Sequence, residues 1–118
     1  MRGWAEACEI ALAYPETVEA RSYGEPSVKT GRSLVCRLRL SDASLVILDV
    51  PAEEREMLLG ADPSVFFVED HYRDHAIVLA YLGKLDPEMF RAFIERRWRN
   101  VATKRAIRTL EERRPDRA

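Results

Sequence analysis

The sequence predicts a two-layer α+β domain in which helices cover one face of an antiparallel, five-stranded sheet. Apolar residues recur at helical spacing near both ends of the chain, and apolar and polar residues alternate in its middle. The strand–helix–strand rhythm that builds a parallel sheet is missing. We therefore expect one helix, three strands, a helix, two strands, and one or two final helices, within a single domain of 118 residues.

The first half of the chain supplies the first helix and three strands. Trp4, Cys8 and Leu12 follow a helical spacing that ends before Pro15, because proline disfavours helical torsions in the residue before it. Strands are expected over residues 18–23, 33–40 and 44–50, and the turns between them at residues 24–26, 30–32 and 41–43. In the strand 33–40 the residues alternate, which predicts an apolar inner face and a basic outer face. The inner face would hold Leu34, Cys36, Leu38 and Leu40, and the outer face Val35, Arg37 and Arg39.

The second half supplies the remaining elements. A short helix is expected over residues 52–59, after Pro51 and before Gly60, and strands over residues 65–68 and 76–82. Asp86 is a predicted N-cap with Pro87 in the first turn, and a stripe running from Phe90 to Val101 marks the face of a long helix. Thr103 would cap a second helix, and residues 113–118 would form a flexible tail.

Composition excludes several classes of protein. An apolar content of 47% and a net charge of −1 argue against disorder, and a chain of this size can bury a core without metal or disulfide staples. There is no apolar run of 18 residues, and acidic residues interrupt the N-terminal segment, so we predict a cytoplasmic protein with no membrane partner. Cys8 and Cys36 have no zinc-type spacing, and we expect both to be buried reduced thiols.

The small net charge hides an uneven distribution. Residues 1–83 carry a net charge of −6 and residues 84–118 a net charge of +5. Such asymmetry points either to a polyanionic partner or to attraction between the two parts of the chain. The predicted nucleic-acid contacts are Lys29, Arg32, Arg37 and Arg39 in the strand region and Lys104, Arg105 and Arg108 in the final helix. The alternative is that these side chains form a solvated surface.

No pattern predicts catalysis. His71 and His75 lie four apart but lack the glutamate of a zinc-hydrolase motif, so no metal site is expected. Cys36 lies on the predicted inner face, where a thiol is an inert small hydrophobe. The chain has neither a phosphate-binding glycine loop nor a nucleophile elbow. We therefore predict a protein without catalytic residues and without cofactors.

Four stretches of the chain resemble the MmcQ/YjbR family. That family has an opening "LA-LPG-V-E", a hairpin "WG-x-PS-hydrophobic-K, GK-x-F-A", a "P-HY … H-W-V" region and a closing helix pattern. The matching residues are 12–18 (LAYPETV), 23–29 (YGEPSVK), 31–35 (GRSLV), Asp70-His71-Tyr72 with His75, and Asp86, Phe90, Phe93, Ile94, Trp98, Ala102, Lys104 and Arg105. The chain departs from the family at Tyr23 and Ala76, where tryptophan is usual, at Val28, where phenylalanine is usual, and at Thr103, where proline is usual.

The resemblance implies a curved antiparallel sheet, similar to those of secretion chaperones and frataxin-like proteins, and DNA binding through a "double wing". It implies no catalytic residues. Our first functional hypothesis is therefore a non-enzymatic protein that binds double-stranded DNA through the basic residues of the sheet and the C-terminal helices. The alternative is a module that binds a protein or a small molecule on the concave face of the sheet. The sequence leaves the oligomeric state open.

Overall fold

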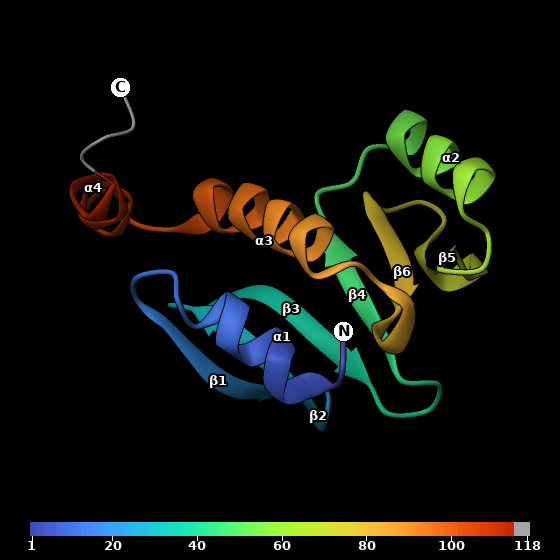
Figure 1. The fold of residues 1–118 in the computed structure, drawn as a ribbon, viewed down its shortest axis with the longest axis horizontal. Helices are drawn as coiled ribbons and strands as arrows, with labels where there is room; N and C mark the ends of the chain where they lie inside the picture. The colour runs from blue at the N-terminus through green and yellow to red at the C-terminus, as the bar shows by residue number, and fades with distance from the viewer. Residues whose placement is uncertain (115–118) are drawn as a thin grey trace.

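The computed structural model describes residues 1–114, and within them an α+β fold combines a six-stranded antiparallel sheet with four α-helices (Figure 1). The strands are β1 (Thr17–Ser22), β2 (Glu25–Thr30), β3 (Ser33–Arg39), β4 (Ser44–Leu48), β5 (Phe66–Phe67) and β6 (Ile77–Tyr81). The helices are α1 (Trp4–Ala11), α2 (Ala52–Ala61), α3 (Pro87–Val101) and α4 (Lys104–Arg113), with 3₁₀ turns η1 (Asp70–Tyr72) and η2 (Leu82–Lys84). The sheet order is β1-β2-β3-β4-β6-β5.

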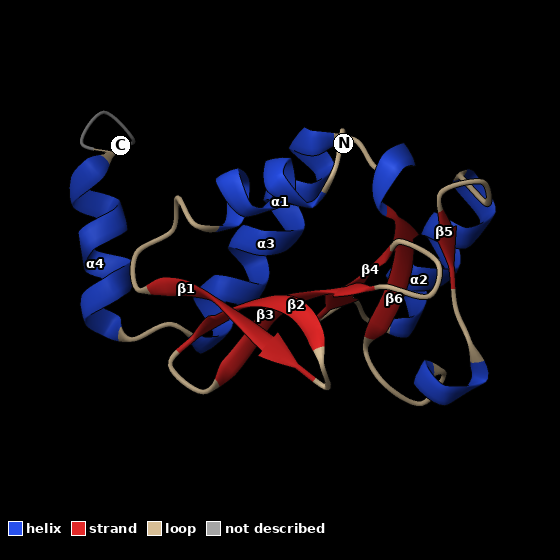
Figure 2. Cartoon of the chain, turned by 90° about the horizontal axis from the view of Figure 1, so that it is seen from below, coloured by secondary structure: helices blue, strands red, loops and turns tan. Residues whose placement is uncertain are grey.

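The helices α1 and α3 lie together over one face of the sheet (Figure 2). The buried core lies between them and the sheet and includes Cys36, Leu45, Phe90 and Trp98. The β1–β2 turn and the loop between β5 and β6 project from the other side of the sheet (Figure 2). We call this side the open face, and it carries the site described below.

The prediction of five strands was wrong because residues 24–26 do not form a loop. Tyr23 and Gly24 alone make the turn, with φ angles of 54° and 76°, and β2 begins at Glu25. Two consecutive positive φ angles are the signature of a tight hairpin turn whose twist matches the strands. Pro26 is tolerated in β2 because β2 pairs with β3 only from Ser27 onward, so the missing N–H removes no bond to β3.

A β-bulge corrects the predicted faces of β3. Val28 pairs with Cys36 and Lys29 pairs with Leu34, so Val35 is an extra residue on β3. Val35 is consequently buried in the core, whereas Leu34 lines the open face together with Arg37. The prediction had placed Leu34 on the inner, core-facing side of the strand and Val35 on the outer side. Leu40, expected in the core, is 61% exposed beyond the end of β3.

The helical predictions at the C-terminal end are confirmed. Asp86 accepts a hydrogen bond from the N–H of Met89, and Thr103 accepts one from the N–H of Ala106, so both residues cap helices. Trp98 is fully buried, and its indole Nε1 donates to the carbonyl of Pro15 at 3.0 Å. The prediction that the apolar stripe of α3 packs into the core is therefore confirmed.

Arg114, the last described residue, is tied to α3 through the carboxylate of Glu95. Glu95 accepts hydrogen bonds from Tyr14, Arg99 and Arg114. Burial alone would raise the pKa of Glu95, but the hydrogen bonds from Arg99, Tyr14 and Arg114 outweigh it and lower the pKa to about 2. Arg113 belongs to α4 and not to the flexible tail expected over residues 113–118, and residues 115–118 lie outside the described residues.

Two smaller differences concern element ends. The α2 helix runs through Gly60 to Ala61, two residues past its predicted end at Leu59. The strand expected over residues 65–68 is reduced to Phe66–Phe67 and pairs only with β6. The strand β6 has neighbours on both sides, as predicted. None of the helices within residues 1–114 combines the length and the apolar character needed to cross a bilayer.

Candidate functional site

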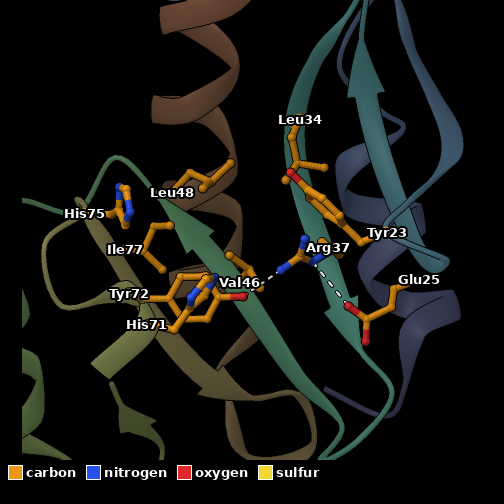
Figure 3. Close-up of a pocket in the computed structure, with 10 residues that line it drawn as sticks. All are labelled: Tyr23, Glu25, Leu34, Arg37, Val46, Leu48, His71, Tyr72, His75 and Ile77. Carbon is orange, nitrogen blue, oxygen red and sulfur yellow. Dashed lines mark hydrogen bonds and ion pairs between the residues drawn. The ribbon is translucent and has the colours of Figure 1, made fainter. Parts of the chain in front are cut away.

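A pocket of about 330 Å³ lies on the open face, between the β1–β2 turn and the loop that joins β5 to β6 (Figure 3). Its volume is at the lower end of the range of small-molecule sites, roughly 300–1,000 Å³. The lining residues are Tyr23, Glu25, Leu34, Arg37, Val46, Leu48, His71, Tyr72, His75 and Ile77. Apolar side chains from β3, β4 and β6 form the floor, and aromatic and charged side chains stand at its sides (Figure 3).

The register of the sheet explains how the floor forms. Arg37 of β3 pairs with Val46 of β4, so the two side chains point to the same face. The neighbours of Val46, Leu45 and Ile47, point into the helix-covered core. Leu34 joins this face only because of the bulge. The floor is therefore a product of strand pairing and not of any contiguous motif.

Arg37 is the central polar residue of the pocket, and it is only 8% exposed. Its Nη2 donates to the hydroxyl of Tyr72 at 2.7 Å, and its Nε lies 3.4 Å from Glu25 Oε1 in an ion pair without directed hydrogen-bond geometry. The guanidinium carbon lies 5.1 Å from the centre of the Tyr23 ring, a cation–π contact. A buried cation needs such partners because its transfer from water costs several kcal/mol (~3 or more).

Tyr23 stands at the mouth of the pocket in a strained conformation. It is 89% exposed, although it is a large aromatic residue, and its φ of 54° is a value that bulky side chains rarely adopt. Left-handed backbone at a residue other than glycine costs about 1–2 kcal/mol. Strained residues of this kind cluster at binding and catalytic sites. The position of Tyr23 thus marks the pocket mouth as a candidate site.

Arg55 of α2 builds the opposite wall and was missed by the sequence analysis. It is 6% exposed, and its guanidinium donates to the carbonyls of Arg73, His75 and Ile77 at 2.9, 2.8 and 3.1 Å. The loop that carries His71 and Tyr72 is folded around this cation. One signal was available, since Arg55 is the only cation in a helix otherwise rich in glutamate.

The predicted DNA contacts Arg37 and Arg39 both point to the open face but are occupied by partners. Arg39 pairs with Asp42 at 2.9 Å and also with Glu69, and its side chain is 12% exposed. The hydrogen bond to Glu69 raises the pKa of Arg39. The outer face of β3 therefore carries cations that acidic residues balance.

The other predicted DNA contacts are more exposed and lie toward the other end of the sheet. These residues are Lys29, Arg32, Lys104, Arg105 and Arg108. Glu16 accepts hydrogen bonds from Thr103 and Arg105 at the start of α4, and the next residue, Thr17, pairs with Thr30 beside the β2–β3 turn. The start of α4 and the β2–β3 turn are therefore neighbours. Arg105 is ion-paired with Glu16 at 2.9 Å.

Two histidines and two cysteines are the remaining groups that could support other chemistry. His71 and His75 line the same pocket, but residues 1–114 contain no group of three or more potential ligands able to hold a metal ion. Cys8 and Cys36 are buried free thiols, as predicted. Burial raises the pKa of Cys8 to about 12 and also raises that of Cys36, so neither forms a thiolate near neutral pH.

Comparisons with known proteins assign this chain to no family. No protein-family model, no curated protein and no solved structure matches it. The resemblance to the MmcQ/YjbR family therefore rests on the quoted motifs and stays a prediction.

Proposed function

We propose that this chain is a non-enzymatic binding module and that the pocket on the open face holds a small molecule. The observation that carries the proposal is Arg37, a buried cation at the centre of an apolar hollow, whose Nη1 donates no hydrogen bond to residues 1–114. Binding sites for small molecules combine an apolar surface with a few convergent polar groups. The lining contains no serine, cysteine or lysine, and we propose that its polar side chains serve as ligand contacts.

The recessed position of Arg37 favours a small ligand over a DNA duplex at this face. Phosphate contacts need side chains that reach outward to a charged backbone. Arg37 is instead 8% exposed, beneath the ring of Tyr23, and Glu25 and Tyr72 already hold its Nε and Nη2. A compact ligand that enters the hollow can reach this residue.

Fragment binding followed by NMR tests the proposal. We expect small two-ring compounds to shift the backbone amide signals of Val46 and Ile77, which lie in the pocket floor. The variant Leu48→Trp should abolish these shifts because the larger side chain fills the hollow. Leu40→Trp is the matched control, since Leu40 is 61% exposed outside the pocket. If no fragment shifts pocket signals in the unsubstituted protein, the proposal is wrong.

A second candidate function, DNA binding, is favoured by the closeness of the β2–β3 turn to the start of α4. Lys29, Arg32, Lys104 and Arg108 have no acidic partner within residues 1–114. If these four cations neutralise about four phosphates, affinity for a duplex should fall about 100-fold between 50 and 200 mM salt. The double variant Lys104→Glu/Arg108→Glu should abolish binding. No binding at 50 mM salt would eliminate this candidate.

A further inference from the structure

We infer that the ligand of the pocket is a planar aromatic molecule with a single carboxylate. This inference rests on the proposed small-molecule function and adds the chemical class of the ligand. Its elements are two hydrogen-bond donors, a local charge that disfavours a dianion, and an aromatic ring placed to cover a flat molecule.

The first donor is Nη1 of Arg37. The Nη2 atom is bonded to Tyr72, and of the guanidinium nitrogens only Nε is both enclosed and without a hydrogen bond. Nη1 donates no hydrogen bond to any of residues 1–114. It is therefore accessible from the pocket with its donors unused.

The second donor is the hydroxyl of Tyr72. Its oxygen accepts from Arg37 at 2.7 Å, and its own hydrogen is given to none of residues 1–114. Because the two groups are hydrogen-bonded to each other, the free donors belong to neighbouring side chains in the wall of the pocket (Figure 3). Two adjacent donors match the two oxygens of a carboxylate.

The local charge favours a carboxylate over a phosphate. Glu25 lies 3.4 Å from Arg37 and is held in place because its other oxygen accepts the N–H of Leu40 at 2.9 Å. The Arg37–Glu25 pair carries no net formal charge, so a monoanionic ligand adds one negative charge beside Glu25 and a dianion adds two. A carboxylate therefore meets less repulsion from Glu25 than a phosphate dianion does. Its single charge is spread over two oxygens that both find hydrogen-bond donors.

The shape of the pocket favours a flat aromatic body. Leu34, Val46, Leu48 and Ile77 offer an apolar floor, and the ring of Tyr23 stands beside the guanidinium of Arg37. Aromatic rings attract one another in offset or edge-to-face contacts beyond their buried area. A ring laid on the floor would have Tyr23 above it and its carboxylate at Arg37. This role would explain why a strained tyrosine stands in the turn. Glycine and asparagine tolerate the positive φ without strain, but neither carries an aromatic ring.

Three probes with the same ring system test the inference: 2-naphthoate, 2-naphthyl phosphate and 2-naphthalenemethanol. Titration calorimetry gives the affinities, and the amide signals of Val46 and Ile77 report the place of binding. We expect 2-naphthoate to bind most tightly. Tyr72→Phe should weaken it about 10- to 100-fold, the loss typical of a hydrogen bond to a charged group, and should leave the alcohol nearly unchanged. Tyr81→Phe, outside the pocket, is the matched control.

The outcomes separate the two proposals. Equal affinity for the acid and the alcohol, with both shifting pocket signals, leaves a small-molecule site but overturns the carboxylate. Tighter binding of the phosphate overturns the monoanion. Tyr23→Asn, which keeps the turn because asparagine tolerates positive φ, should weaken all three probes. If it does not, the aromatic part of the inference fails. If none of the probes shifts pocket signals, the carboxylate inference is overturned, whereas the small-molecule function fails only if the wider fragment screen is also negative.

Discussion

Replacing Arg55 by methionine tests whether one buried cation holds the pocket wall together. The substitution keeps most of the side-chain length and removes the hydrogen bonds to the carbonyls of Arg73, His75 and Ile77. Each bond from a charged donor contributes about 1.5–3 kcal/mol, so three give about 6 kcal/mol. Burial of the charge costs several kcal/mol (~3–4) and is relieved by the substitution. We expect a net loss of about 2–3 kcal/mol, and a melting temperature lower by about 10 °C.

Urea denaturation followed by circular dichroism measures this loss, and hydrogen exchange at the amide of Ile77 reports whether the loop opens first. Arg55→Lys should lose nearly as much stability as Arg55→Met, because an ammonium cannot reach carbonyls on separate sides. Arg73→Met is the control, since the Arg73 side chain is 56% exposed and within residues 1–114 pairs only with Asp70, and it should change stability by about 0.5 kcal/mol or less. If Arg55→Met is no worse than this control, the wall is not held by Arg55.

Three further predictions concern stability. Tyr23→Asn relieves about 1–2 kcal/mol of strain, because asparagine accepts the positive φ, and removes a cation–π contact worth about 0.5–1 kcal/mol, so the free energy of unfolding measured in urea should rise by about 0.5–1 kcal/mol; a lower value would contradict the strain. Glu95→Gln should be less stable than the parent at pH 6, and the gap should close as the pH falls from about 5 toward 2. The folded pKa of Glu95 is about 2, below its ordinary value, so the carboxylate contributes stability above that ordinary value and loses it in acid; a gap independent of pH would refute this. Trp98→Phe should cost about 2 kcal/mol, since the buried bond to the Pro15 carbonyl is lost and a small cavity forms; thermal unfolding that matches the parent would show that the bond contributes nothing.

The helix boundaries could be predicted from sequence because their signals are local. Asp86 and Thr103 each bond an amide three residues ahead, so the capping residue and the capped turn are read from one short stretch. The stripe on α3 likewise repeats at a spacing that only a helix can bury on one side.

The sixth strand and the pocket depend on pairings that a local pattern does not contain. The bulge at Val35 is set by the register of β2 against β3, and it exchanged the faces of two neighbouring side chains. The acids that balance Arg39 include Glu69, 30 positions away, so a count of cations along β3 overstated its positive surface. The carbonyls around Arg55 lie 17 to 22 positions ahead of it. Sequence reasoning found the histidines and tyrosines of the pocket but had no means of bringing them together.

The hydrogen bond between Arg37 and Tyr72 joins two segments 35 positions apart, one on the β1–β3 side of the molecule and the other in the loop before β6. A ligand held by both residues would add a link between these two segments that exists only after each has folded. Contacts made after the transition state act on the unfolding rate and leave the folding rate nearly unchanged. Occupancy of the pocket would therefore lengthen the lifetime of the native state, and with it the resistance to proteolysis, without making the protein fold faster.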